Sequence, residues 1–353
     1  MKILISTQLG LGNAVLLTAF IKTLLEVFDQ PQITLIGKKN SPGVEFLSLH
    51  PGIARIQENL DSEKYDIGFL PFLGNHTRLL EQLFWTGKTK KIISHTLQSP
   101  HPFKQTLKTG YMTLNKLRGI QYIPVQLHQH EVWNYLNLLE PLGIPQSKFV
   151  LTPDIPASMQ QKAVDSVLEM VLPHSFFTVQ CMVSNTQKTP KSWPVEYWGH
   201  VLTELLEQSS DHVVFVGTRG EEQSAESVIK ELPSHLRHRC LNLSGKTTIE
   251  SLTGVLKKSR YFIGADSGIA HLSAALQKKT MVLWGPSPWG RCHPIGSETV
   301  YANLGLPCSP CVGIFHYTDQ EAYDRCAYQH RCMSELTPNL LLNLLKQNQF
   351  SEI

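Results

Sequence analysis

The sequence is poor in charged residues and has no large excess of either sign. Charged residues make up only 17% of its 353 residues, and 32 Lys and Arg against 29 Asp and Glu leave a formal net charge of +3. Nucleic-acid-binding proteins usually concentrate a much larger positive charge on one surface. We therefore expect no nucleic-acid partner.

The sequence also lacks the features of membrane-spanning and secreted proteins. The uncharged stretch from Ile3 to Ile21 is interrupted by glycines and is followed by no clear small-residue cleavage site. No other stretch approaches the roughly 18 apolar residues that a bilayer-spanning helix needs. The 7 cysteines are an odd number, which predicts reduced thiols rather than a secreted disulfide framework. We therefore expect a cytoplasmic protein.

Two common site motifs are missing. The 15 histidines form no HExxH or similarly close metal-binding spacing. The turn Gly10-Leu11-Gly12 lacks the third small residue of a dinucleotide-binding fingerprint, and this disfavours a redox enzyme.

Strand-like and helix-like segments alternate along a chain about twice the usual domain length. Continuous apolar runs predict buried strands at residues 1–7, 32–37, 65–70, 91–94, 176–180, 212–217, 261–265 and 280–284. The segment LTPDIPAS, from Leu151 to Ser158, reads as an extended connection. The pattern predicts two successive doubly wound α/β units.

In such sheets ligands bind where strands end, so we examined the turns there. The strongest candidate is Gly264-Ala265-Asp266-Ser267-Gly268-Ile269-Ala270-His271, between a strand and a helix. The N-terminus of a helix attracts phosphate groups. The alternative is that Asp266 or Ser267 only caps the helix and His271 is an ordinary buried histidine.

Two further turns have the same position relative to a strand. In Lys188-Thr189-Pro190-Lys191-Ser192-Trp193-Pro194, Trp193 would anchor a helix, and a lysine could neutralise a departing diphosphate or simply be solvated. In Gly217-Thr218-Arg219-Gly220-Glu221-Glu222, a carboxylate could cap the helix or bind ribose hydroxyls.

These segments together resemble a known family. The text KTPKSWP, VVFVGTRGEE, LSGKTTIESL, GADSGIAHLSAAL and WGPSP is similar, in order and spacing, to the C-terminal half of glycosyltransferase family 9, the heptosyltransferases. The opening LGLGNAVLLTAFIKTL resembles the family's first motif less closely.

The resemblance implies a GT-B fold, in which two Rossmann-like domains face a central cleft. It places an acceptor-binding domain at residues 1–155 and a donor-binding domain at residues 156–335. Residues 336–353 would form a C-terminal helix, for which packing back on the N-terminal domain is one arrangement. The implied activity is inverting, metal-independent transfer of a sugar, with ADP-heptose as the expected donor and a glycan or glycolipid of the lipopolysaccharide type as the acceptor. A glycolipid acceptor implies transient contact with the inner membrane surface.

The resemblance also assigns roles to individual residues. Lys191 faces the diphosphate, Glu221 or Glu222 binds the ribose, and Ser267 and Gly268 offer amides to the phosphates. The full set of expected donor-binding residues is Gln180, Lys191, Glu221, Glu222, Asp266, Ser267, Gly268 and His271. Gly12 and Asn13 are expected on the acceptor side, and Lys191, Asp266 and Asn13 are the expected catalytic residues.

Asn13 departs from the family pattern, because many members have an aspartate there as the proposed base. An amide is not basic, and Asn13 is also a suitable N-cap residue. Three explanations stay open: another group such as Asp66 or His76 is the base, Asn13 only positions the acceptor, or the chain binds sugar nucleotides without efficient transfer. Another sugar-nucleotide enzyme on the same fold, such as an epimerase or a transferase that uses UDP-sugars, is the alternative activity.

Four cysteines, Cys308, Cys311, Cys326 and Cys332, fall within one short segment. This spacing is compatible with a structural zinc or iron site, with buried thiols or with disulfides. We expect no cofactor for catalysis itself.

Overall fold

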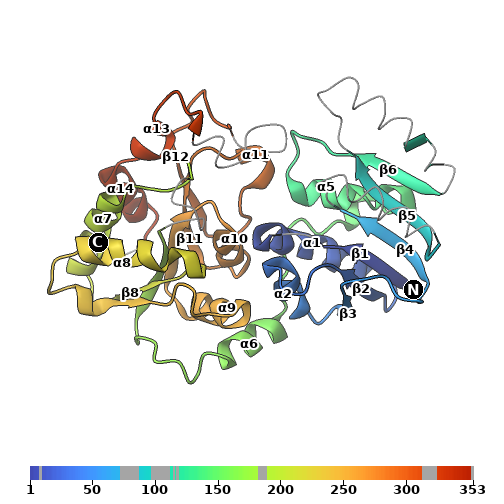
Figure 1. The fold of residues 1–353 in the computed structure, drawn as a ribbon, viewed down its shortest axis with the longest axis horizontal. Coiled ribbons are helices and arrows are strands. Elements are labelled where there is room, and N and C mark those ends of the chain that lie inside the picture. The colour runs from blue at the N-terminus through green and yellow to red at the C-terminus, as the bar shows by residue number, and fades with distance from the viewer. Residues whose placement is uncertain are drawn as a thin grey trace. The chain divides into compact units, whose positions relative to one another are not determined.

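The computed structural model describes residues 1–7, 10–71, 87–96, 112–113, 116, 119–181, 189–311 and 324–350. The chain divides into two compact units, Met1–Met159 and Gln160–Ile353. The division falls within helix α6 (Ala157–Asp165), just after the predicted extended connection. Each unit is built on a six-stranded parallel sheet with helices on its faces (Figure 1).

The sheet of the first unit has the strand order β3-β2-β1-β4-β5-β6. Its strands are β1 (Lys2–Ser6), β2 (Gln32–Ile36), β3 (Ile53–Gln57), β4 (Tyr65–Leu70), β5 (Thr89–Thr96) and β6 (Ile120–Pro124). Its helices are α1 (Leu11–Val27), α2 (Pro42–Ser48) and α5 (Glu131–Asn137), with 3-10 turns at Glu140–Leu142 and Gln146–Lys148. The chain leaves β1 first toward β2 and later toward β4, so the topological switch point lies between β1 and β4.

The sheet of the second unit has the strand order β12-β11-β10-β7-β8-β9. Its strands are β7 (Phe176–Gln180), β8 (His212–Phe215), β9 (Cys240–Asn242), β10 (Tyr261–Ala265), β11 (Lys279–Trp284) and β12 (Thr299–Asn303). Its helices are α7 (Val195–Glu207), α8 (Glu222–Glu231), α9 (Ile249–Lys258), α10 (Gly268–Ala275), α11 (Trp289–Cys292), α13 (Arg331–Ser334) and α14 (Pro338–Gln347), with 3-10 turns at Arg219–Glu221 and Arg237–Arg239. Here the switch point lies between β7 and β10.

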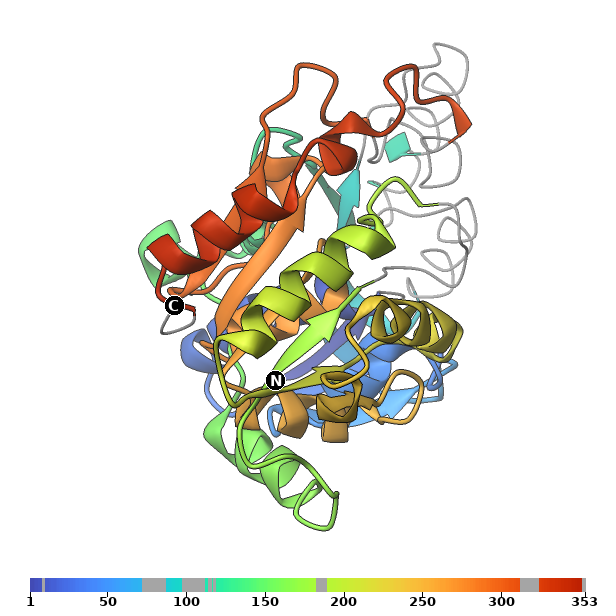
Figure 2. The same ribbon diagram turned by 90° about the vertical axis from the view of Figure 1, so that its left-hand side faces the viewer.

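The central strands are buried on both sides, as their apolar sequences require. In β10, all five residues of the sequence YFIGA are buried, and the same holds for FFTVQ in β7. Helices α7 and α14 lie side by side over one face of the second sheet (Figure 2). Leu341 and Leu345 of α14 belong to the same core as Trp198 and Leu202 of α7. The C-terminal helix therefore packs within the second unit, which differs from the expectation that it packs back on the N-terminal domain; its leucine stripe finds an apolar partner in α7.

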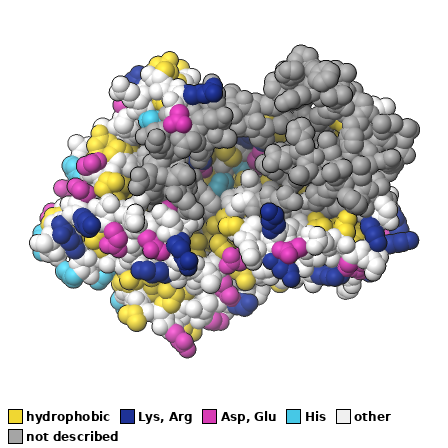
Figure 3. All heavy atoms as spheres, viewed as in Figure 1, with side chains coloured by type: hydrophobic (Ala, Val, Ile, Leu, Met, Phe, Trp, Pro, Cys, Tyr) yellow, Lys and Arg dark blue, Asp and Glu magenta, His cyan; other side chains and the backbone are white. Residues whose placement is uncertain are grey.

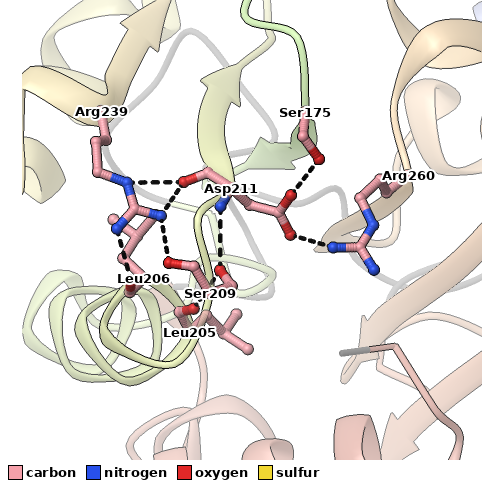
Figure 4. Close-up of polar contacts among 7 residues, drawn as sticks. All are labelled: Ser175, Leu205, Leu206, Ser209, Asp211, Arg239 and Arg260. Carbon is pink, nitrogen blue, oxygen red and sulfur yellow. Dashed lines mark hydrogen bonds and ion pairs between the residues drawn. The ribbon is translucent and has the colours of Figure 1, made fainter. Parts of the chain in front are cut away.

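A polar network lies at the edge of the second sheet that is formed by the amino-terminal ends of its strands (Figure 4). The guanidinium of Arg239 donates to the backbone carbonyls of Leu206, Ser209 and Asp211. The carboxylate of Asp211 accepts from the Ser175 hydroxyl at 2.5 Å and pairs with Arg260 at 2.6 Å. This network joins the C-terminal end of α7 to the starts of β7, β8 and β10. It lies away from the edge formed by the carboxyl ends of the strands, where ligands of such sheets bind.

Basic and acidic side chains are interspersed over the described part of the face in Figure 3. Within the described ranges, no helix combines the length and the apolar character needed to cross a bilayer.

Candidate functional site

The residues predicted for donor binding converge at the carboxyl edge of the second sheet, at its switch point. Gln180 is the last residue of β7, and it stands opposite Gly264 of β10 in the parallel register. Asp266 and Ser267 follow β10 directly, so they reach the same edge. Ligands of doubly wound sheets bind in the crevice at such a point.

Asp266 lies at the centre of this group, because it contacts both Ser287 and Lys191. It is 7% exposed, and its Oδ2 accepts a hydrogen bond from the Ser287 hydroxyl at 2.5 Å and lies 3.0 Å from Lys191 Nζ. Burial by itself raises the pKa of Asp266, but the charge of Lys191 and the Ser287 hydroxyl outweigh it and hold that pKa below its ordinary value. The pair is therefore a carboxylate and an ammonium ion, largely shielded from water.

The loop before α7 is fixed so that Lys191 reaches Asp266. Trp193 is 3% exposed, its indole N–H donates to the Leu336 carbonyl at 2.7 Å, and its ring packs edge-on to Trp198. The backbone N–H of Lys191 donates to the Thr189 hydroxyl at 3.3 Å. The prediction that Trp193 anchors this helix start is confirmed. Lys188, the other lysine of the motif, lies outside the described residues.

Ser267 and Gly268 form the start of helix α10. Ser267 is the N-cap residue, and its hydroxyl accepts from the Ala270 N–H at 3.2 Å. The same hydroxyl donates to Oε1 of Gln180 at 2.5 Å. Capping satisfies one donor, and the other N–H groups of the first turn, with the helix dipole, still favour an anion. The capping interpretation and the phosphate-binding interpretation are thus compatible.

His271 lies one turn into α10 and is 6% exposed. The Cys292 backbone hydrogen-bonds its ring, while Nδ1 is buried without a partner. Burial lowers the pKa of His271 to about 4, more than the nearby Asp266 raises it. The imidazole is therefore neutral at physiological pH and adds no charge to the Lys191–Asp266 pair.

Of the two candidate ribose-binding acids, Glu221 is the one joined to this group. Its carboxylate accepts from the Thr218 N–H at 2.8 Å and from Gln180 Nε2 at 3.3 Å. Thr218 and Glu221 form a capping box, and burial raises the pKa of Glu221 to about 7. A Cβ on Gly217 would lie only 2.2 Å from Glu221 Oε2, so a larger residue there would displace the Glu221 carboxylate from its present position. Gln180 thereby links Glu221 to Ser267 across the switch point.

Glu222 occupies a different position at the start of α8. It is half-buried, and its Oε1 would lie 2.4 Å from a Cβ on Gly245, a residue with a φ of +71°. The capping interpretation therefore applies to Glu221. Glu222 is the adjacent acid at the start of α8.

Gly12 and Asn13 belong to the first unit, in the first turn of α1. The N-cap of α1 is Gly10, and no side chain caps it. Asn13 is therefore not the N-cap residue that its chemistry suggested; the helix begins earlier because Gly10 adopts the extended conformation of a cap. The first turn contains no acidic side chain.

Asp66, one of the suggested alternative bases, is at the wrong edge of its sheet. Its carboxylate accepts from the Lys2 N–H at 2.9 Å and pairs with Lys90 at 2.6 Å. The hydrogen bond from Lys90 is the main reason why the pKa of Asp66 is lowered. Thr7 comes five positions after Lys2, and at about 3.3 Å per residue the two are about 16 Å apart. Asp66, bonded to Lys2, therefore lies at the end of β1 away from Thr7 and from the turn that contains Asn13. His76 lies outside the described residues.

The four clustered cysteines are free thiols, each partly buried. Burial, followed by the proximity of Cys311, Cys326 and Cys308, raises the pKa of Cys332 to about 12. Among the described residues, no group of three or more His, Cys, Asp or Glu side chains is arranged to hold a metal ion. Of the three alternatives for this cluster, the described residues show free thiols and do not show a zinc or iron site.

Ser287 was missed from the sequence, although it binds the central carboxylate. It lies in the turn Gly285-Pro286-Ser287, directly after β11. Its position after a buried strand was the available signal, because that strand ends at the same edge as β10.

Two doubly wound units, with a lysine–aspartate pair and a helix N-terminus at the switch point of the second, are what the resemblance to GT-B glycosyltransferases predicts, and comparisons with known proteins show this class. Residues 98–321 match the model of glycosyltransferase family 9 (heptosyltransferase). The chain belongs to glycosyltransferase family 9.

The chain is also similar to individual members over its full length. It is 24% identical to lipooligosaccharide heptosyltransferase 2 of Campylobacter jejuni subsp. jejuni serotype O:2, over 99% of both chains. Its fold matches the structure of Escherichia coli ADP-heptose lps heptosyltransferase II with a TM-score of 0.71 at 15% identity, covering 99% of this chain and 98% of that one. It also matches E. coli heptosyltransferase WaaC with ADP-2-deoxy-2-fluoro heptose, with a TM-score of 0.67 at 15% identity, over 99% of this chain and all (100%) of the other.

Proposed function

We propose that this glycosyltransferase transfers heptose from ADP-heptose to a lipopolysaccharide- or lipooligosaccharide-type acceptor, with inversion at the anomeric carbon and without a catalytic metal. The observation that carries the proposal is the largely buried Lys191–Asp266 pair beside the N-terminus of α10. The names of the similar proteins support heptose and ADP as the donor's components.

The donor's diphosphate would lie at the β7/β10 switch point. There the first-turn amides of α10, at Gly268 and beyond, and the ammonium group of Lys191 face the developing negative charge. Asp266 keeps Lys191 in place, and Ser287 keeps Asp266 in place. The ribose hydroxyls would face the carboxylates that follow β8, at Glu221 and Glu222. His271, neutral at physiological pH, shapes the site without adding a charge to it.

In the reaction, an acceptor hydroxyl oxygen attacks the anomeric carbon while the bond from that carbon to the β-phosphate oxygen breaks and its electron pair leaves with the diphosphate. The hydroxyl proton passes to water or to a phosphate oxygen of the departing ADP, because the Asn13 amide cannot hold it. Inversion follows because attack and departure occur on opposite sides of the carbon. A fixed cation and fixed amides at the leaving group can supply the charge stabilisation that a metal supplies elsewhere.

The acceptor would bind to the first unit, near Gly12 and Asn13. The amide oxygen of Asn13 can accept a hydrogen bond from the acceptor hydroxyl and orient it, but it cannot hold the proton. Asn13 is therefore proposed as a positioning residue. A glycolipid acceptor places the enzyme in the cytoplasm with transient contact to the inner membrane surface.

Calorimetric titration of the purified protein with ADP, UDP and GDP tests the donor site. We expect ADP to bind most tightly, and Asp266→Ala to abolish that binding while Asp165→Ala, an exposed control on α6, leaves it unchanged. Preference for UDP or GDP would overturn the ADP assignment and favour an epimerase or a transferase with another donor. Absence of binding to all three would favour a protein without this donor site.

Transfer is then measured with ADP-heptose and an acceptor that lacks the heptose. We expect ADP release that depends on the acceptor, a product of inverted configuration by NMR, and no loss of rate in EDTA. Donor binding without any transfer would favour a non-catalytic nucleotide-sugar-binding protein.

A further inference from the structure

An exposed indole lies next to the buried donor-site residues. Trp289 of α11 is 41% exposed, whereas Trp193, Trp198 and Trp284 of the same unit are at most 3% exposed. The ring is a large, rigid apolar surface with a polar N–H group, so an indole left exposed beside a polar site is available to contact a ligand.

The indole is held in one orientation by three neighbouring rings. His293 stacks on it with centroids 5.0 Å apart and planes at 14°, and Tyr301 and Trp284 meet it edge-on at 4.2 Å and 5.5 Å. The His293 ring N–H donates to the Trp289 carbonyl at 2.9 Å. A side chain fixed in this way loses little entropy when a ligand packs against it.

Two contacts tie this segment to the donor-site residues. Trp289 follows Ser287, which donates to Asp266, by two residues, and two residues of backbone span at most about 7 Å. At the other end of α11, the Cys292 backbone hydrogen-bonds the His271 ring. The indole is therefore within reach of a group attached to a phosphate at this edge.

The order of the strands decides which part of the donor would meet the indole. Strands β8 and β11 lie on opposite sides of the central pair β7 and β10. Glu221 and Glu222, the proposed ribose partners, follow β8, so the nucleoside extends to that side. The sugar, joined to the β-phosphate by one oxygen, then lies on the β11 side, where Trp289 follows the strand.

We propose that the exposed indole of Trp289 is a binding platform for the sugar ring of the nucleotide-sugar donor. This inference rests on the proposed function. Pyranose rings have faces formed by C–H groups, and these pack on aromatic rings while the hydroxyls remain free for polar contacts. Trp289 would thus help to fix the anomeric carbon relative to the departing diphosphate.

The test compares the binding of ADP and ADP-heptose to the full-length chain by calorimetry. For Trp289→Ala we expect the affinity for ADP-heptose to fall about 5- to 10-fold, the size of an aromatic contact, and the affinity for ADP to stay within about twofold. Trp289→Phe, which keeps a ring in the packed position, should recover most of the loss. Tyr328→Ala, which removes an aromatic ring that is 54% exposed elsewhere in the same unit, should change neither affinity.

Fluorescence gives a second readout that does not depend on the alanine variant folding. In the wild type, ADP-heptose should change the tryptophan emission more than ADP does, and in Trp289→Phe that difference should disappear. Equal losses for ADP and ADP-heptose, no loss for either, or a loss confined to the KM of the acceptor would overturn the platform.

The experiments distinguish a wrong donor assignment from a wrong role for Trp289. If the wild type prefers UDP, the ADP-heptose assignment fails, and the platform is judged on UDP-glucose against UDP with the same expected ratio. If ADP-heptose binds and reacts but Trp289→Ala leaves the ratio unchanged, the proposed function stands and the platform is wrong. If no nucleotide binds, both are overturned.

Discussion

Lys191 Nζ lies 3.0 Å from Asp266 Oδ2, and the two side chains are only 18% and 10% exposed. Lys191 comes from the loop before α7 and Asp266 from the end of β10, so the pair joins the two strands that flank the switch point. A carboxylate beside a diphosphate would by itself repel it. The Asp266 carboxylate instead holds the Lys191 ammonium group in position.

Lys191→Met should lower the rate of transfer by about 100-fold or more, because a fixed donor to the leaving group is lost. It should also destabilise the protein, since removing one partner leaves the buried charge of Asp266 unpaired. Steady-state kinetics and thermal unfolding measure the two effects. Lys246→Met removes a lysine whose ammonium group bonds the Asn242 carbonyl, and it serves as the control.

The double variant Lys191→Met/Asp266→Asn separates the two effects. With both charges removed, the unfolding temperature should return toward that of the wild type while transfer stays low. Recovery of transfer in the double variant, or normal transfer in Lys191→Met, would contradict the assigned role.

Glu221 predicts a pH dependence of stability. Its pKa is raised to about 7 by burial, whereas an unfolded glutamate has a pKa of 4.5. The folded state therefore binds the proton more tightly, so this group's contribution is fully present below pH 4.5 and is lost as the pH rises toward 7. A shift of this size corresponds to about 3 kcal/mol, an order-of-magnitude figure.

Glu221→Gln imitates the protonated side chain and should remove this dependence. The variant should match the wild type in unfolding temperature near pH 4 and exceed it above pH 7.5. Glu222→Gln, one residue away and half-buried, is the matched control. A difference between wild type and Glu221→Gln that does not change with pH would show that Glu221 is ionised throughout this range in the folded protein.

The central strands of both sheets could be predicted from the sequence, but the edge strands could not. Strands β3, β6, β9 and β12, which form the edges, were all missed. Their burial is partial, as in IARIQ of β3 and TVYAN of β12. A strand covered on fewer sides does not need a continuous apolar run, so its sequence carries a weaker signal.

The donor-side residues could be predicted one turn at a time, but their connections could not. The functional residues of the three turns, such as Asp266, Lys191 and Glu221, were recognisable by their type and by their position after a strand. That Gln180 bonds both Ser267 and Glu221, and that Ser287 bonds Asp266, depends on the register of strands far apart in the sequence. Spacing along a chain contains no information on such contacts, and for the same reason Asp66 was suggested for an edge from which it points away.

Asn13 gives a prediction on the acceptor side. Asn13→Ala should lower kcat about tenfold and leave the affinity for ADP unchanged, because a hydrogen bond that orients the acceptor is lost. Asn13→Asp should raise the rate above that of the wild type and make it fall at low pH, since a carboxylate can accept the proton and is favoured at a helix N-terminus. Gln32→Ala, at the opposite edge of the same sheet, is the control. Wild-type kinetics in Asn13→Ala would remove this residue from the acceptor site.

Arg239 predicts a loss of stability without a loss of binding. Its guanidinium donates to three backbone carbonyls at the edge of the sheet away from the donor site (Figure 4). Lysine offers a single ammonium group and cannot reproduce this fork, so Arg239→Lys should destabilise the protein by about 1–3 kcal/mol. Arg237→Lys, two residues earlier and bonded to the Leu232 and Lys230 carbonyls at the surface, should cost less. Because α10, Lys191 and Asp266 are untouched, the affinity for ADP below the unfolding transition should equal that of the wild type. A weakened affinity in Arg239→Lys would mean that the two edges of this sheet are coupled, which a rigid parallel sheet does not predict.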